Sequence, residues 1–236
     1  EYNGLKVGVG KTTIYGEEIQ KLGRIAAAGK FPKAPAKPVT ITRMDMKPAY
    51  LRRVRQIIKL ARPLKVVVDA ANGVGGLTAI DLYRSLGCEV IPLFCEVDGN
   101  FPNHHADPTK KANLADIIKA VKRHKADVGI AFDGDVDRLG GCDEKGNMLP
   151  GDRLLALFAR SILAEKPGAT ILGEVKCSRG LYEDIRKHGG NAVMWRTGHS
   201  HIKAAMKKLH AELAGEMSGH IFFKHRWYGF DDAVYA

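Results

Sequence analysis

The stretch KVVVDAANGVGG, residues 65–76, indicates the fold class. Its three consecutive valines form a short apolar run, and a glycine-rich segment follows the run directly. A helical pattern extends over residues 77–86, Gly87 ends it, and residues 89–94 again have the composition of a strand. A strand, a glycine loop, a helix and a second strand in this order predict a βαβ unit of an α/β protein.

The same order of elements occurs twice along the chain. After the first unit, apolar residues at helical spacing predict a helix over residues 113–125, and a strand is expected over 127–132. Further along we expect a helix, a strand, a helix and a strand over residues 153–164, 169–175, 181–187 and 191–195. The repetition predicts two successive α/β units of similar build.

Two segments are candidate boundaries between domains. Residues 26–40, AAAGKFPKAPAKPVT, have the Pro, Ala and Lys content of a connector, and what precedes them is expected to be the tail of an earlier domain. The turn over residues 148–152 separates the two α/β units. We therefore expect a remnant with linker, a second domain and an incomplete third domain over residues 1–44, 45–148 and 149–236.

Composition restricts the class of protein. The chain has 236 residues, 45% hydrophobic and 27% charged, which is typical of a globular protein, and no apolar run is long enough to span a membrane. The four cysteines show no CxxC pair, which favours reduced thiols and a cytoplasmic location. The net charge of +11 suits anionic small molecules as well as nucleic acid. We expect no nucleic-acid or membrane partner, because the basic residues are spread over predicted helix faces.

The acidic loop DGDVDR, residues 133–138, follows a predicted strand. Three carboxylates at alternate positions repel one another, so a compensating charge is required. Mg²⁺ prefers such oxygen ligands, and Asp133, Asp135 and Asp137 are therefore candidate metal ligands, with Arg138 placed to hold a phosphate oxygen. An EF-hand is excluded because Arg138 stands where that loop needs glycine. A phosphatase with Asp133 as nucleophile remains an alternative, and so does a basic nucleic-acid-binding module.

The polar loop EMSGH, residues 216–220, is a second candidate site. Glu216, Ser218 and His220 present a carboxylate, a hydroxyl and an imidazole at a spacing of two, which suits vicinal sugar hydroxyls that donate and accept hydrogen bonds. Elsewhere, the adjacent His104 and His105 are expected to be structural. Trp227 and Tyr228 are expected to serve packing.

Several of these motifs, in order along the chain, resemble the α-D-phosphohexomutases. DGDVDR resembles the metal-binding loop of that family, GEMSGH its sugar-binding loop, and EYNGLK the stretch after its phosphoserine loop. EVDGNFPNHHADP and WRTGHS are similar to the bacterial phosphomannomutase/phosphoglucomutase branch. The resemblance implies consecutive three-layer α/β/α units with mixed sheets, as in domains 1 to 3 of these isomerases.

The resemblance also implies a reaction in carbohydrate metabolism. A phosphoserine exchanges a phosphoryl group with a hexose 1-phosphate or 6-phosphate of mannose or glucose, through a 1,6-bisphosphate, with Mg²⁺ as cofactor and glucose 1,6-bisphosphate as activator or intermediate. By position, the catalytic residues are Lys6, Arg138, Lys176 and His199. The substrate-binding residues are Lys176, His199, Glu216, Met217, Ser218, Gly219 and His220.

Two departures from the family pattern affect the expected activity. The serine of the Ser-His-Asn-Pro loop and the fourth domain are not in these 236 residues, so we expect a fragment that is inactive alone. Val136 stands where the family usually has glycine, and a β-branched residue is strained there if the backbone needs a positive φ.

Overall fold

The computed structural model describes residues 7–10, 12–33 and 40–236, and the chain forms two compact units, 1–45 and 46–236. The first unit holds an antiparallel pair, β1 (Gly8–Val9) and β2 (Thr12–Thr13), and helix α1 (Glu17–Ala28). The three alanines that we expected to open the connector form the end of α1 instead. Alanine favours helix, and Gly29, at φ 62°, ends it in the left-handed conformation.

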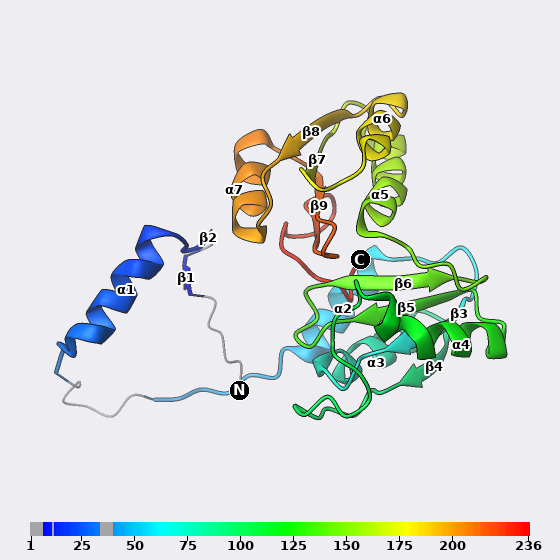
Figure 1. Ribbon diagram of the computed structural model, residues 1–236, viewed down its shortest axis with the longest axis horizontal. Coiled ribbons are helices and arrows are strands. Elements are labelled where there is room, and N and C mark those ends of the chain that lie inside the picture. Colours follow the sequence, from blue (N-terminus) through cyan, green and yellow to red (C-terminus); the bar gives the residue numbers. More distant parts are fainter. Residues whose placement is uncertain (1–6, 11, 34–39) are drawn as a thin grey trace. The chain divides into compact units, whose positions relative to one another are not determined.

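The second unit begins with a four-stranded mixed sheet (Figure 1). Its elements are α2 (Lys47–Ile57), β3 (Lys65–Asp69), η1 (Val74–Leu77), α3 (Ala79–Ser85), β4 (Glu89–Leu93), η2 (Lys111–Leu114), α4 (Ala115–His124), β5 (Val128–Phe132) and β6 (Leu139–Asp143). The strand order is β4-β3-β5-β6, with β3 parallel to β4 and β5, and β6 antiparallel to β5.

The valine run explains why this sheet has helices on both faces. Successive side chains of a strand point to opposite faces. Val66 and Val68 pack in one core with residues of α2 and α3, whereas Val67 packs in another with residues of α4. All three valines are buried, so β3 is an inner strand of the sheet in a three-layer arrangement.

The second half of the unit repeats this topology. Its elements are α5 (Gly151–Glu165), β7 (Thr170–Glu174), α6 (Arg179–Lys187), β8 (Asn191–Trp195), α7 (His199–Leu209), β9 (Leu213–Gly215) and β10 (Ile221–Phe223). The order β8-β7-β9-β10 has the same sequence of parallel, parallel and antiparallel pairings. Ile171 packs towards α5 and α6 and Leu172 towards α7, and Figure 1 shows these helices on opposite sides of the strands.

The acidic loop and the polar loop occupy equivalent positions in the two halves. The acidic loop joins β5 to the antiparallel β6, and the polar loop joins β9 to the antiparallel β10. The two loops also contact each other: the N–H of Leu139 donates to the carbonyl of Gly219 at 2.9 Å, and Arg138 forms an antiparallel bridge with His220. The repeat therefore brings both candidate sites to one place.

The C-terminal segment, residues 224–236, joins the two halves further. Trp227, Ala233 and Val234 are buried in the same core as Val66 of the first sheet. The hydroxyl of Tyr83 donates to the carbonyl of Val234 at 3.1 Å. The second half thus contributes side chains to the core of the first, and Trp227 is a packing residue, as expected.

The predicted elements are found close to their expected bounds, with some differences. Strand β8 covers the expected residues 191–195, and α5 extends the expected helix at both ends. Strand β6 was not predicted, because Leu139–Asp143 is rich in glycine and lacks a polar and apolar alternation. His199 is the first residue of α7.

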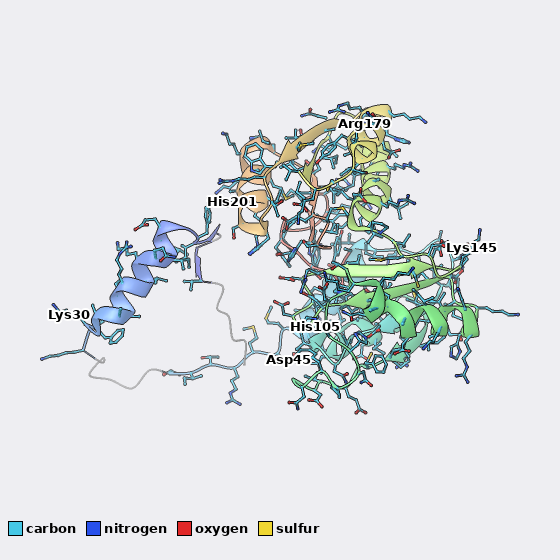
Figure 2. All side chains as sticks on the ribbon, in the orientation of Figure 1. Lys30, Asp45, His105, Lys145, Arg179 and His201 are labelled. Carbon is cyan, nitrogen blue, oxygen red and sulfur yellow. The ribbon has the colours of Figure 1, made fainter. Side chains whose placement is uncertain are left out.

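The surface and the cysteines agree with the composition. Basic side chains of α4 are exposed, and Lys145 and Arg179 project from different parts of the second unit (Figure 2). The four cysteines form no disulfide, and among the described helices none has the length and apolar character needed to cross a membrane.

Val136 has φ 66°, so the strain anticipated from the sequence is present. We predict that Val136→Gly is more stable than Val136→Ala by about 1 kcal/mol, because the left-handed conformation disfavours a Cβ atom. The comparison between the two variants cancels the loss of the valine side chain. Urea unfolding measures the difference.

The control lies in a regular helix. Ala156 is inside α5, where replacement by glycine should lower the free energy of unfolding by about 1 kcal/mol. A glycine variant at Val136 that is less stable than the alanine variant would contradict the prediction.

Candidate active site

Asp133 shapes the acidic loop at the carboxyl end of β5. Its side chain is buried, and its Oδ1 accepts hydrogen bonds from the backbone N–H groups of Asp137 and Arg138, both at 3.1 Å. Its Oδ2 accepts from Nε of Arg138 at 2.7 Å. The loop therefore turns back on its own first carboxylate, and the guanidinium of Arg138 compensates the charge.

The acidic loop has the donor set of a divalent cation site. One oxygen from each of Asp133, Asp135 and Asp137 lies within 4.8 Å of the others, and Asp135 is exposed. Burial raises the pKa of Asp133 to about 6, against the lowering effect of Arg138 and the backbone donors. Three hard oxygen donors with an exposed member fit Mg²⁺.

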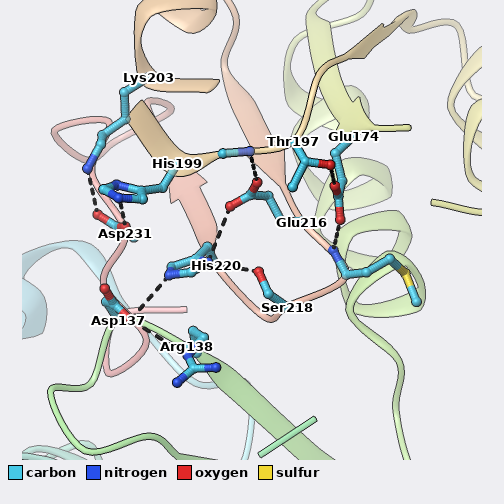
Figure 3. Close-up of polar contacts among 12 residues, drawn as sticks. Asp137, Arg138, Glu174, Thr197, His199, Lys203, Glu216, Ser218, His220 and Asp231 are labelled. Atoms are coloured by element: carbon cyan, nitrogen blue, oxygen red, sulfur yellow. Dashed lines mark hydrogen bonds and ion pairs between the residues drawn. The ribbon is translucent and has the colours of Figure 1, made fainter. Parts of the chain in front are cut away.

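His220 is the centre of the polar contacts in the polar loop (Figure 3). Its Nδ1 lies 2.8 Å from Oγ of Ser218 and 3.2 Å from Oε2 of Glu216, and its Nε2 lies 3.3 Å from Oδ1 of Asp137. Burial lowers its pKa, but the hydrogen bonds with Asp137 and Glu216 outweigh burial and raise the pKa to about 9. His220 is therefore a cation at neutral pH, linking the two loops.

Glu216 anchors the polar loop to the start of α7. Its carboxylate is buried, and Oε1 accepts the N–H of Gly198 at 2.7 Å while Oε2 faces His220. Burial opposes ionisation, yet the hydrogen bonds from His220 and Gly198 hold its pKa below the usual value. Glu216 is thus an ionised carboxylate at neutral pH, which can accept hydrogen bonds from hydroxyl groups.

Glu174 is a site residue that the sequence analysis missed. It ends β7, is fully buried, and accepts hydrogen bonds from the hydroxyl of Thr197 and from the N–H of Met217, the latter at 3.0 Å. Nζ of Lys176 lies 3.4 Å from its Oε1. One carboxylate therefore holds the Lys176 loop, the segment before α7 and the polar loop. The sequence feature that could have identified Glu174 is a single glutamate at the end of an otherwise apolar strand.

Asp231 is a second residue that was missed. Its Oδ1 pairs with Nζ of Lys203 at 3.2 Å, and its Oδ2 lies 4.0 Å from Nδ1 of His199. The ring of His199 stacks on that of His220, with centroids 5.8 Å apart. The C-terminal segment thus closes one side of the candidate site.

The structure brings most of the expected residues together. The acidic loop, Lys176, His199 and the polar loop all lie at the carboxyl ends of β5, β7, β8 and β9, where open α/β sheets bind ligands. Lys6 lies outside the described residues. His104 binds the buried Asp69, with Nε2 3.0 Å from Oδ2, which agrees with a structural role.

Comparison with known proteins identifies the family. The family model "Phosphoglucomutase/phosphomannomutase, alpha/beta/alpha domain II" matches residues 48–146, and the model for domain III matches residues 150–236. The chain belongs to the phosphoglucomutase/phosphomannomutase family. The resemblance noted in the sequence and the fold class of α/β/α units with mixed sheets are therefore both confirmed.

Individual relatives span the whole chain. It is 51% identical over 236 residues to a phosphoglucomutase from Neisseria gonorrhoeae, and 49% identical over 236 residues to a phosphomannomutase/phosphoglucomutase from Pseudomonas aeruginosa. It covers 51% and 50% of these two proteins, so the chain spans about half the length of the curated relatives it matches. A family protein from Burkholderia thailandensis superposes with a TM-score of 0.90 at 48% identity, covering 94% of this chain and 48% of that one.

The ion pairs of His220 should make the stability of the metal-free protein depend on pH. The pKa is raised from 6.5 to about 9 in the folded state, so the stabilisation is fully present below pH 6.5 and is lost as the pH rises through 9. We predict a loss on the order of 3 kcal/mol in the free energy of unfolding across this window.

Urea unfolding in the presence of a chelator, at several pH values, measures the effect. His220→Gln is the matched variant, because it removes the titrating group and retains a hydrogen-bonding side chain. The expected result is a steeper decline for the unchanged protein than for the variant. Parallel curves would contradict the assignment of this effect to His220.

Proposed function

We propose that this chain carries the metal-binding and sugar-binding part of a phosphohexomutase, an enzyme that interconverts hexose 1-phosphates and 6-phosphates of mannose or glucose. The observation that carries the proposal is the contact between the acidic loop and the polar loop, through Leu139 and Gly219 and through Asp137 and His220. A cation site and a hydroxyl-binding site are thereby adjacent. The relatives that share about half of its residues are named phosphoglucomutase and phosphomannomutase/phosphoglucomutase, which supports the same activity.

We propose the following roles for the acidic loop. Asp133, Asp135 and Asp137 hold Mg²⁺, which, when bound, neutralises charge on a transferring phosphoryl group. Arg138 is 29% exposed at its side chain and already compensates Asp133, so it can turn a donor towards a phosphate oxygen. Transfer in this chemistry proceeds between a phosphoserine and the sugar, with glucose 1,6-bisphosphate as intermediate.

We propose that the second half of the unit binds and orients the sugar. Glu216 accepts hydrogen bonds from sugar hydroxyls, and Ser218 and the backbone around Met217 and Gly219 shape the loop. His220 is a cationic donor beside Asp137 and can pass a proton to a sugar oxygen. Lys176 is more than half exposed at its side chain, and it and His199 supply further donors to the substrate.

The contacts of Asp133 favour a ligand role over that of a phosphatase nucleophile. Both of its oxygens accept hydrogen bonds from the loop, which hold the carboxylate in one orientation, as suits a ligand better than an attacking nucleophile. Basic side chains such as Lys145 and Arg179 project from different parts of the second unit (Figure 2), which gives no support to the nucleic-acid alternative. We also propose that the chain divides into domains at residues 44/45 and 148/149, and that the enzyme is cytoplasmic.

We predict that the 236-residue chain binds Mg²⁺ weakly, with the three aspartates as its only protein ligands. Asp135→Ala should abolish the remaining binding without unfolding the protein, because Asp135 is exposed. Isothermal titration calorimetry with Mg²⁺ measures both. Tight binding that survives Asp135→Ala would place the ion elsewhere.

We predict that the 236 residues alone do not interconvert glucose 1-phosphate and glucose 6-phosphate, even with Mg²⁺ and glucose 1,6-bisphosphate. Phosphoryl transfer depends on positioning, and these residues include no Ser-His-Asn-Pro loop. A coupled assay tests this directly. Turnover that is proportional to the concentration of the chain and is abolished by Asp133→Ala would show that the nucleophile lies within these 236 residues.

A chimera tests the positive side of the proposal. Replacing the matching half of the Pseudomonas aeruginosa relative with this chain should give an active mutase. Glu216→Ala in the chimera should lower kcat/KM by about 100-fold, the loss expected for hydrogen bonds to a charged group. Net release of inorganic phosphate, with no sugar phosphate isomer formed, would instead support a phosphatase.

A further inference from the structure

A second group of metal-ligating side chains lies beside the acidic loop. Asp137, His220 and Asp231 come from the acidic loop, the polar loop and the C-terminal segment, and one ligand atom of each lies within 4.8 Å of the others. Figure 3 shows them where these three segments meet. This group shares only Asp137 with the aspartates assigned to Mg²⁺, and it contains an imidazole.

His220 has the surroundings of a metal ligand. Glu216 and Ser218 contact its Nδ1, which leaves Nε2 directed towards Asp137 at 3.3 Å. In metal sites, a ligating histidine usually donates its other ring N–H to a carboxylate or similar acceptor, which fixes the ring and raises its basicity. Glu216 provides this support, and the stacked ring of His199 further limits rotation.

Asp231 supplies an independent observation. Its side chain is 6% exposed, and its Oδ2 is buried and accepts no hydrogen bond from any described residue, with Nδ1 of His199 4.0 Å away. A buried carboxylate oxygen without a donor is uncommon and destabilising, and an ion is one of the partners that can satisfy it.

We propose that Asp137, His220 and Asp231 bind a divalent transition-metal ion of the Zn²⁺ class, at a site that shares Asp137 with the proposed Mg²⁺ site. One imidazole nitrogen and two carboxylate oxygens are a donor set typical of Zn²⁺ and Co²⁺, whereas Mg²⁺ prefers oxygen alone. The site does not depend on the mutase activity, but occupancy would engage Asp137 and His220 and so inhibit it.

Nearby cationic side chains repel a bound metal ion, and this repulsion leads to a specific prediction. Lys203 pairs with Oδ1 of Asp231 at 3.2 Å, and Nε of Arg138 lies 4.0 Å from Oδ1 of Asp137. Removing the charge of Lys203 should therefore strengthen metal binding. A variant that merely loosened the fold would not have this effect.

Titration of the 236-residue chain with Co²⁺, followed by visible absorption, tests the proposal. We expect the intense bands of a site with nitrogen and low coordination number, and, because Asp137 belongs to both sites, we expect Mg²⁺ to weaken them only at large excess. Asp231→Asn and His220→Ala should each abolish the bands, and Lys203→Gln should shift the titration to lower Co²⁺. Asp135→Asn is the control: it alters only the Mg²⁺ site and should leave the bands unchanged.

Circular dichroism and thermal melting establish that each variant is folded. If either Asp231→Asn or His220→Ala fails to fold, the other still tests the site. Absence of the bands in the unchanged chain overturns the proposal. So does a spectrum that is lost in Asp135→Asn but retained in Asp231→Asn, because the ion would then lie among the three aspartates. A Lys203→Gln variant that binds Co²⁺ more weakly would also contradict it.

Discussion

The hydrogen bond from the N–H of Leu139 to the carbonyl of Gly219 is the contact on which the candidate site depends. It joins the first residue of β6, directly after the acidic loop, to the polar loop, so it fixes the separation of the two loops. The approach is close enough that a Cβ on Gly219, at φ 92°, would lie 2.5 Å from the carbonyl oxygen of Leu139. Only glycine meets both the conformation and the space.

Buried carboxylates organise the surroundings of that contact. Asp133, Glu174 and Glu216 are buried at the ends of strands. Asp133 accepts hydrogen bonds from its own loop, and Glu174 and Glu216 accept them from neighbouring segments. A buried charge without such donors is strongly unfavourable, so each loop has one arrangement in which the charge is tolerated. The same groups that determine the loop conformations thus present the polar surface of the site.

The sequence predicted the parts that local pattern determines. Valine-rich strands, helical spacing and glycine stops gave β3, α3, β4, α4 and β8, and the spacing of Asp133, Asp135 and Asp137 gave a group that the structure brings together. Local pattern did not give β6, which is held by pairing with β5, or the burial of Trp227 in a core formed mainly by earlier residues. Glu174 and Asp231 were missed for the same reason, because their partners are distant in sequence. The strain at Val136 was anticipated from the family resemblance, because the family usually has glycine at that position.

The internal repeat explains why a cation site and a hydroxyl-binding site are neighbours. Each sheet ends in an antiparallel pair, β5 with β6 and β9 with β10, and the loop of each pair extends from the carboxyl end of its parallel strand. Arg138 and His220 then bridge the two loops antiparallel to each other, as in a short continuation of a sheet. With the backbone contact provided by the repeated topology, the side chains are free to differ: three carboxylates in one loop, and a carboxylate, a hydroxyl and an imidazole in the other. The chemical difference between the two halves therefore lies in two short loops, while the two sheets that position them keep one topology.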